Sequence, residues 1–257
     1  MAPAFQLLGE DEGKPVWVEN SEARGETVIV CEHGGNLIPK RLGTLGLERE
    51  VLQRHIAWDP GALALARRIA ASLDAELYHQ RFSRLVYDCN RPPEAESATP
   101  SKSEIYSIPG NIGIRPDQRN ARIEEIYRPF RDGLSSLIQR RVAAGKATTL
   151  VTVHSFTPVY LGKTRDVEVG ILHDRDSRLA DAMIAEADRM QTDYVVRRNE
   201  PYGPADGVTH TLVEHGLANG LPNVMIEVRN DLLEDEDGQT AMAAFLTNLI
   251  KESRAVL

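Results

Sequence analysis

Chemically capable side chains follow several apolar runs of this sequence, at the point where each run ends. His33, His154 and Glu227 each come at the end of such a run, and the polar stretch 88–91 follows another. Short apolar runs rich in β-branched residues predict buried strands. In open α/β sheets, ligands bind beyond the carboxyl ends of the strands. We therefore expect these side chains, which come from distant parts of the chain, to meet at one edge of a sheet.

The residue types at this edge suit a metal-assisted hydrolysis. Imidazole and carboxylate are ligands of catalytic zinc-type ions, which commonly take three protein ligands and one water. His33 and His154 are the first two candidate ligands, and Asp59 is the candidate third. A bound divalent ion lowers the pKa of its water to ~7, so hydrolysis further needs a base and a cation for an anionic substrate group. Glu227 is the candidate base and Arg91 the candidate cation.

Each of these residues also has a purely structural interpretation. Asp59 precedes a proline and could simply cap a helix. Arg91 could pair with Asp88, as structural ion pairs form readily. Glu227 is harder to explain in this way, because an unpaired carboxylate is costly to bury. Among the other histidines, His55 shares the ambiguity of Asp59.

Two further residue pairs raise the possibility of a metal-free nucleophile. Cys31 lies two residues before His33, and Ser155 directly follows His154. Neither pair lies in a known Cys-His signature or between nucleophile-elbow glycines, so both are disfavoured. Cys31 and Cys89 are predicted to be buried, without a disulfide. His79 is predicted to be a surface residue.

The elements that must position these groups alternate along the chain. Strands are predicted at 27–31, 76–78, 85–87, 148–153, 167–172, 194–197 and 223–228. Helices are predicted at 54–73, 116–144, 177–190 and 240–254. Strands alternating with helices indicate an α/β fold with three αβα layers around a mixed, mostly parallel sheet. The long stretch 94–113, rich in Ser, Pro and charge, is predicted to be a substrate-proximal loop, and Gly34 with Gly35 is expected to leave room for substrate.

Composition excludes several classes of protein. The 257 residues are expected to form a single domain, 1–257. The formal charge of -8 argues against a nucleic-acid partner, since nucleic-acid binders usually carry a basic face. No apolar run approaches the roughly 18–20 residues that span a bilayer, and residues 1–20 lack the pattern of a signal peptide. We therefore expect a cytoplasmic protein with a small-molecule partner, and the oligomeric state stays open.

Six stretches of the chain carry a resemblance to a known family. They are "EHGGNLIP" at 32–39, "HIAWDPGA" at 55–62, "FSRLVYDCNRPP" at 82–93, "VTVHSFTPVY" at 151–160, "NEPYGPADGVTH" at 199–210 and "VMIEVRNDL" at 224–232. In these stretches the sequence resembles the N-formylglutamate amidohydrolase family, in particular its less characterised branch. The resemblance implies a phosphorylase/hydrolase-like fold similar to that of the zinc exopeptidases and aminoacylases.

The resemblance also implies roles for individual residues. His33 and His154 match the metal ligands, Asn90 and Arg91 the pair that grips the substrate carboxylate, and Glu227 the base. Arg229 and Tyr202 are further candidates for substrate binding.

The third ligand is where the sequence departs from its relatives. Their usual His-x-x-Glu is absent, because Asn36 stands three residues after His33. Asp59, Glu32 and Asn36 are therefore alternatives for this ligand.

The implied reaction is metal-dependent hydrolysis of an N-formyl or other N-acyl amino acid, an acidic one such as N-formylglutamate, to the free amino acid and a carboxylate. The implied ion is zinc, with cobalt as the alternative, and the implied setting is amino acid metabolism such as histidine catabolism. The other hypothesis is a non-catalytic protein that binds or senses a carboxylate ligand and has kept the fold but lost the metal site.

Overall fold

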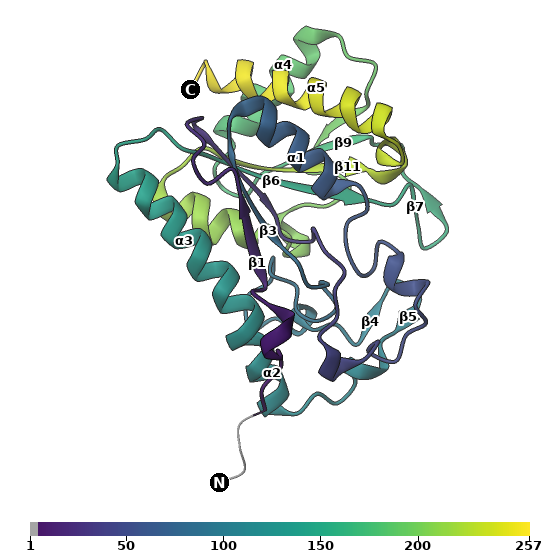
Figure 1. The fold of residues 1–257 in the computed structure, drawn as a ribbon. Coiled ribbons are helices and arrows are strands. Elements are labelled where there is room, and N and C mark those ends of the chain that lie inside the picture. The colour runs from purple at the N-terminus through teal and green to yellow at the C-terminus, as the bar shows by residue number, and fades with distance from the viewer. Residues whose placement is uncertain (1–4) are drawn as a thin grey trace.

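The computed structural model describes residues 5–257, and a seven-stranded sheet forms its centre (Figure 1). The strand order is β1-β3-β2-β6-β11-β9-β10. The strands are β1 (Val16–Glu19), β2 (Thr27–Cys31), β3 (Glu76–Gln80), β6 (Thr149–Phe156), β9 (Val169–Leu172), β10 (Val196–Arg198) and β11 (Asn223–Arg229). Pairing is antiparallel between β1 and β3 and between β9 and β11, and parallel elsewhere. The predicted mixed, mostly parallel sheet is therefore confirmed.

Helices cover both faces of this sheet (Figure 1). On one face, α1 (Ala62–Leu73) and α4 (Arg178–Met190) pack against α5 (Glu236–Arg254). On the other face lie α2 (Pro116–Arg122) and α3 (Arg128–Ala143), joined without a break by a π-helical turn. The three αβα layers predicted from the sequence are thus present.

The central strands read as continuous apolar runs because both of their faces are buried. Every residue of β2 and β6 is buried, and alternate side chains point to opposite faces of the sheet. In β2, Ile29 and Cys31 pack in the core beneath α1, α4 and α5, whereas Val28 and Val30 pack beneath α3. This double burial makes the strands rigid mounts for the residues at their carboxyl ends.

The segment 94–113 is folded and tied to the rest of the chain. It contains the small hairpin of β4 (Lys102–Ser103) and β5 (Tyr106–Ser107). The buried Asn111 side chain donates hydrogen bonds to the carbonyl oxygens of Leu85 and Pro100, at 2.8 and 2.9 Å. A second small hairpin, β7 (Val159–Tyr160) and β8 (Lys163–Thr164), follows β6.

The predicted strand at 85–87 is wrong. These residues are buried but form a turn, because Ser83 donates its hydroxyl to the Ala57 carbonyl at 2.6 Å and accepts the Leu85 amide at 3.1 Å. Those local hydrogen bonds take the place of strand pairing. The apolar run reflects burial under the 94–113 loop and not a place in the sheet.

Three further predictions need correction. The helix expected at 54–73 begins at Ala62, after Gly61, whose φ of 80° and close approach to Leu233 require glycine. His79 is 3% exposed in β3, and its Nε2 lies 3.0 Å from Glu19 Oε1, so it is not a surface residue. Gly35 does not make room for substrate, since a Cβ there would lie 2.1 Å from the carbonyl oxygen of Arg81.

Within residues 5–257, none of the helices combines the length and the apolar character that crossing a membrane would need.

Candidate active site

Three neighbouring strands deliver the central residues of the site. His33 follows β2, His154 lies near the carboxyl end of β6, and Glu227 pairs in register with His154 from β11. Asp59 comes from the loop before α1. The parallel pairing of β2, β6 and β11 aligns their carboxyl ends, which is why residues up to about 200 positions apart meet at one edge.

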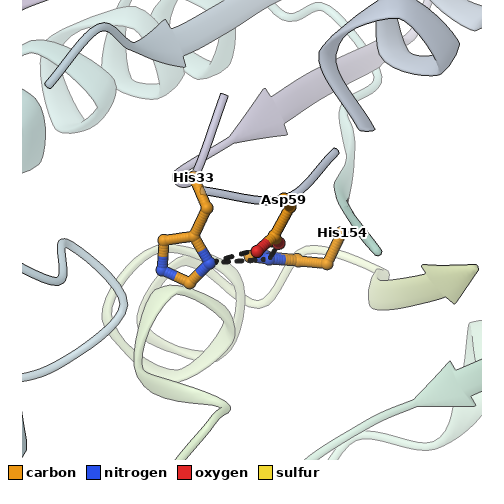
Figure 2. Close-up of side chains that lie close together, drawn as sticks. All are labelled: His33, Asp59 and His154. Carbon is orange, nitrogen blue, oxygen red and sulfur yellow. Dashed lines mark hydrogen bonds and ion pairs between the residues drawn. The ribbon is translucent and has the colours of Figure 1, made fainter. Parts of the chain in front are cut away.

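His33, Asp59 and His154 form a tight cluster of buried donor atoms (Figure 2). Asp59 Oδ2 lies 3.3 Å from His33 Nδ1 and 2.9 Å from His154 Nδ1. The two Nδ1 atoms lie 3.2 Å from each other. The three side chains come from separate segments of the chain and point toward one another, with Asp59 contacting both histidines (Figure 2).

The outward-facing nitrogen of each imidazole meets its own carboxylate. His33 Nε2 lies 2.7 Å from Asp88 Oδ1, and His154 Nε2 lies 3.0 Å from Glu32 Oε2. An ionised carboxylate only accepts hydrogen bonds, so the bond to Asp88 places a proton on His33 Nε2. The charge of Glu32, 3.0 Å from His154 Nε2, likewise favours a proton on that nitrogen. Without an ion, the raised pKa of His154 means that its Nδ1 also carries a proton, which it donates to Asp59 Oδ2. When that proton leaves, the Nδ1 lone pair faces Asp59 and the centre of the cluster. Carboxylates behind ligating histidines are the usual partners that orient and polarise such ligands.

The pKa values of these groups show that the cluster favours positive charge on its histidines and negative charge on its carboxylates. Burial opposes protonation of His154, yet the Glu32 and Asp59 carboxylates outweigh burial and hold its pKa well above the usual range. Burial also opposes ionisation of Asp59, but His33 and His154 hold the pKa of this carboxyl below its usual range. The pKa of Asp88 is likewise held well below its usual range, since His33 and Arg84 outweigh its burial.

The donor set fits a divalent ion. Two imidazole nitrogens and one carboxylate oxygen, all buried and all within 4.8 Å of one another, are three ligands of the kind that catalytic zinc uses. A cation at the centre of the cluster would satisfy the three electron-rich atoms that otherwise need shared protons. The Asp59 side chain caps no helix, because it bonds the two histidines instead and the helix starts at Ala62.

The other two alternatives for the third ligand lie elsewhere. Asn36 turns away from the cluster, and its Nδ2 donates to the Leu52 carbonyl at 3.3 Å and to Gln53 Oε1 at 3.1 Å. Glu32 is close to the cluster but stands behind His154, on the side of Nε2. The geometry therefore favours Asp59 as the third donor.

A cavity of about 350 Å³ opens beside the cluster. This volume lies at the small end of the range for small-molecule sites, ~300–1,000 Å³. Besides the three cluster residues, its lining includes Arg84, Asn90, Arg91, Glu227 and the rings of Phe156, Tyr160 and Tyr202.

Glu227 is a buried acid that faces this cavity. It is 4% exposed, and its Oε2 has no hydrogen-bond partner among the described residues. Burial raises the pKa of Glu227 to about 7. A carboxylate with a pKa near neutrality is suited to take up and release a proton.

Arg84 is a cavity residue that the sequence reasoning missed. Its Nη2 donates to Asp88 Oδ2 at 2.8 Å, and its Nη1 lies 3.5 Å from Asp59 Oδ1. Burial opposes its charge, but Asp88 and Asp59 outweigh burial and raise the pKa of the guanidinium. The signal in the sequence is the four-residue spacing from Arg84 to Asp88, which a strand at 85–87 would not turn into a contact.

Arg91 and Asn90 both line the cavity, but their side chains differ in how fully the protein's own hydrogen bonds occupy them. Arg91 Nη1 donates to the carbonyl oxygens of Asn90 and Gly207, at 2.9 and 2.6 Å, and Asp88 pairs with Arg84 instead of Arg91. The Asn90 amide holds the 208–211 segment: its nitrogen donates to the Val208 carbonyl, and its oxygen accepts the Thr211 amide at 2.9 Å. Arg91 is therefore the freer of the two to meet a ligand.

The remaining candidate residues differ in whether they line the cavity. Tyr202 lines the cavity as predicted. Arg229 is not part of the lining, and its guanidinium is bound to Asp231 at 2.8 Å and Glu168 at 3.2 Å, which corrects its assignment to substrate binding. His55 also lines the cavity, with Nε2 3.1 Å from Glu104 Oε2.

Neither alternative nucleophile is poised for attack. Cys31 is buried in the core, and burial raises the pKa of its thiol well above the usual range. The Ser155 hydroxyl donates to the Pro60 carbonyl at 2.7 Å rather than to His154.

Comparison with known proteins identifies a family and two solved structures that this chain resembles. The family model described as N-formylglutamate amidohydrolase matches residues 25–234. A crystal structure of a gene product from Agrobacterium tumefaciens is 55% identical with a TM-score of 0.95, covering 98% of this chain and 99% of that chain. The crystal structure of N-formylglutamate amidohydrolase from Ralstonia eutropha JMP134 shares the fold at 18% identity and a TM-score of 0.64, covering 95% of this chain and 98% of that chain. No curated protein matches the sequence.

Proposed function

The chain belongs to the N-formylglutamate amidohydrolase family, a family of hydrolases that act on amide bonds, and we propose that it cleaves N-formyl or related N-acyl amino acids with the help of a divalent ion. The observation that carries this proposal is the pairing of two features in one cavity. A buried three-donor cluster lies beside Glu227, a buried acid with an unpartnered oxygen.

His33, Asp59 and His154 would hold the ion, with zinc as the first candidate and cobalt as the second. When bound, such an ion polarises the amide carbonyl and lowers the pKa of water. The remaining work falls to the protein. Asp88 and Glu32 keep the two imidazoles in the tautomer that offers Nδ1, and Asp59 contributes the negative charge.

Glu227 acts as the general base in this proposal. Its carboxylate accepts one proton from the attacking water and delivers it to the amide nitrogen as the carbon–nitrogen bond breaks. The products are a carboxylate and a free amino acid, and Glu227 returns to its ionised form. A pKa of about 7 suits both halves of this transfer.

Two arginines supply the positive charge that the substrate needs. Arg91 lines the cavity and would bind the α-carboxylate of the amino acid. Arg84, anchored between Asp88 and Asp59, would stabilise the negative charge that develops on the carbonyl oxygen. Asn90 would act with Arg91 by fixing the 208–211 segment, which directly follows Gly207, the residue whose carbonyl oxygen binds that guanidinium.

The test is Glu227→Gln, a change of nearly equal size. With zinc-loaded protein and a series of N-formyl and N-acetyl amino acids that includes N-formylglutamate, we expect kcat to fall by about 10²–10⁴-fold. Zinc should still bind at one equivalent, because Glu227 is not among the donors. Turnover close to that of the parent would show that Glu227 is not the base.

The rival hypothesis, a carboxylate-binding protein without a working metal site, rested on the absent His-x-x-Glu. Asp59 supplies a third donor from another part of the chain, so the missing spacing does not argue against an ion. Elemental analysis after chelation and re-addition of zinc or cobalt separates the two. A protein that takes up no stoichiometric ion but binds N-acyl amino acids would support the rival.

Cytoplasmic amino acid metabolism, including histidine catabolism, is the setting that we propose.

A further inference from the structure

Two small hairpins each contribute a residue to the wall of the cavity. Ser103 of β4 and Tyr160 of β7 both line the cavity, as does His55 from the loop before α1. The hairpins come from segments more than 50 residues apart, and neither belongs to the central sheet (Figure 1). Their relative position therefore depends on contacts outside any sheet.

Glu104, at the turn between β4 and β5, joins these three parts of the wall. Its Oε1 accepts a hydrogen bond from the backbone amide of Leu161 at 3.3 Å, in the turn between β7 and β8. Its Oε2 lies 3.1 Å from His55 Nε2, and the carboxylate is only 14% exposed. One side chain thus contacts both hairpins and the loop that carries His55.

The rest of the contact between the hairpin tips is weak. Ile105 and Leu161, the apolar residues at the tips, are 69% and 57% exposed, so burial does little to hold them. Across residues 5–257, the Leu161–Glu104 hydrogen bond is the one hydrogen bond between these two turns. Glu104 itself has a φ of 51°, which is unusual for a residue with a long side chain and favours glycine or asparagine. The carboxylate thus occupies a turn position where a smaller residue would suit the backbone better.

We propose that Glu104 is a positioning residue that sets the size of the group accepted at the outer end of the cavity. By holding Ser103, Tyr160 and His55 in place, its carboxylate keeps the wall closed against bulkier N-acyl amino acids. Without it the β7–β8 hairpin can move outward, and the cavity lengthens away from the donor cluster. The inference rests on the proposed function for its substrates, but the hairpin contact can be measured without turnover.

The experiment compares Glu104→Ala with two other variants in zinc-loaded protein. Glu104→Gln keeps an oxygen that can accept the Leu161 amide, so it should restore most of the parent behaviour. Glu96→Ala is the matched control, since Glu96 is an exposed glutamate of the same loop whose side chain has no ion pair among the described residues. The substrates are one amino acid carrying N-formyl, N-acetyl or N-benzoyl groups.

For Glu104→Ala we expect KM for the N-formyl substrate to rise several-fold with little change in kcat. The ratio of kcat/KM for the N-benzoyl to the N-formyl substrate should rise about tenfold, the scale of discrimination that a pocket wall typically provides. The Leu161 amide should exchange its hydrogen with deuterium at least about tenfold faster in Glu104→Ala than in the parent or Glu96→Ala. An unchanged substrate ratio in Glu104→Ala would overturn the proposal.

Dissociation constants for the same ligands, measured by calorimetry in the Glu227→Gln background, separate this failure from failure of the proposed function. Tighter relative binding of the N-benzoyl ligand in Glu104→Ala would support the size limit even if no substrate turned over. Binding of all three ligands with unchanged ratios would refute the role of Glu104 and leave the hydrolase proposal intact. If no N-acyl amino acid binds at all, both proposals fall, and Leu161 exchange still decides whether the carboxylate holds the hairpin.

Discussion

The contact between Glu32 and His154 offers a sharp test of the metal site without touching any proposed ligand. Glu32 is 1% exposed, and its Oε2 lies 3.0 Å from the outward-facing Nε2 of His154. Glu32→Gln keeps the size of the side chain and one of its oxygens but removes its charge. The imidazole then becomes a weaker donor at Nδ1, and the ion at the cluster loses a neighbouring negative charge.

The magnitude follows from the position of this carboxylate directly behind a ligand. Loss of such an outer partner typically weakens metal affinity by about 10- to 100-fold, which corresponds to ~1.4–2.7 kcal/mol of binding free energy. Asp88→Asn should cost at least as much, because Asp88 contacts both His33 and Arg84. Glu22→Gln, an exposed glutamate far from the site in the fold, is the control and should change nothing.

The assay is a competition between the protein and a zinc-binding dye at fixed pH, with circular dichroism to show that each variant is folded. We expect the zinc dissociation constant of Glu32→Gln to rise within the stated range and that of Glu22→Gln to stay within about twofold of the parent. An unchanged dissociation constant in folded Glu32→Gln would refute the reasoning, since His154 would then not bind the ion through Nδ1.

Three other outcomes follow from the same structure. Arg91→Met should raise KM for N-acyl amino acids by about 10- to 100-fold, because hydrogen bonds to charged groups contribute ~1.5–3 kcal/mol, whereas Arg229→Met should change KM less than about twofold. Asp59→Asn should abolish stoichiometric zinc binding in elemental analysis, while Asn36→Ala should retain it. Burial lowers the pKa of His215 to about 4, so the unfolded chain takes up this proton first as the pH falls. The contribution of the neutral His215 to the free energy of unfolding is therefore complete above pH ~6.5 and is lost toward pH ~4, about 3 kcal/mol in all. The free energy of unfolding in urea should depend less steeply on pH in His215→Gln than in the parent. Equal pH dependence in the two proteins would contradict the lowered pKa of His215.

The fold was the most predictable level of this protein. Residues 27–31 and 223–228 were recognised as strands because central parallel strands are buried on both faces and must be apolar throughout. The same rule failed at 85–87, where the apolar residues are buried beneath a loop instead of in the sheet. An apolar run in the sequence indicates a buried segment. Whether that segment is a strand depends on the hydrogen-bond partners of its backbone.

For the site, the sequence by itself determined which chemical groups gather at the sheet edge. His33, His154 and Glu227 lie at or near the carboxyl ends of buried strands, and parallel pairing brings such ends together whatever the details of packing. What only the tertiary structure decided was which atoms face which. In the folded chain, the Nδ1 atoms of both histidines face Asp59, and the Asn36 side chain points away from the cluster. Arg84 lies in the wall of the cavity. The physical reason is that side-chain direction in loops depends on contacts between distant segments, and no spacing within one segment encodes those contacts.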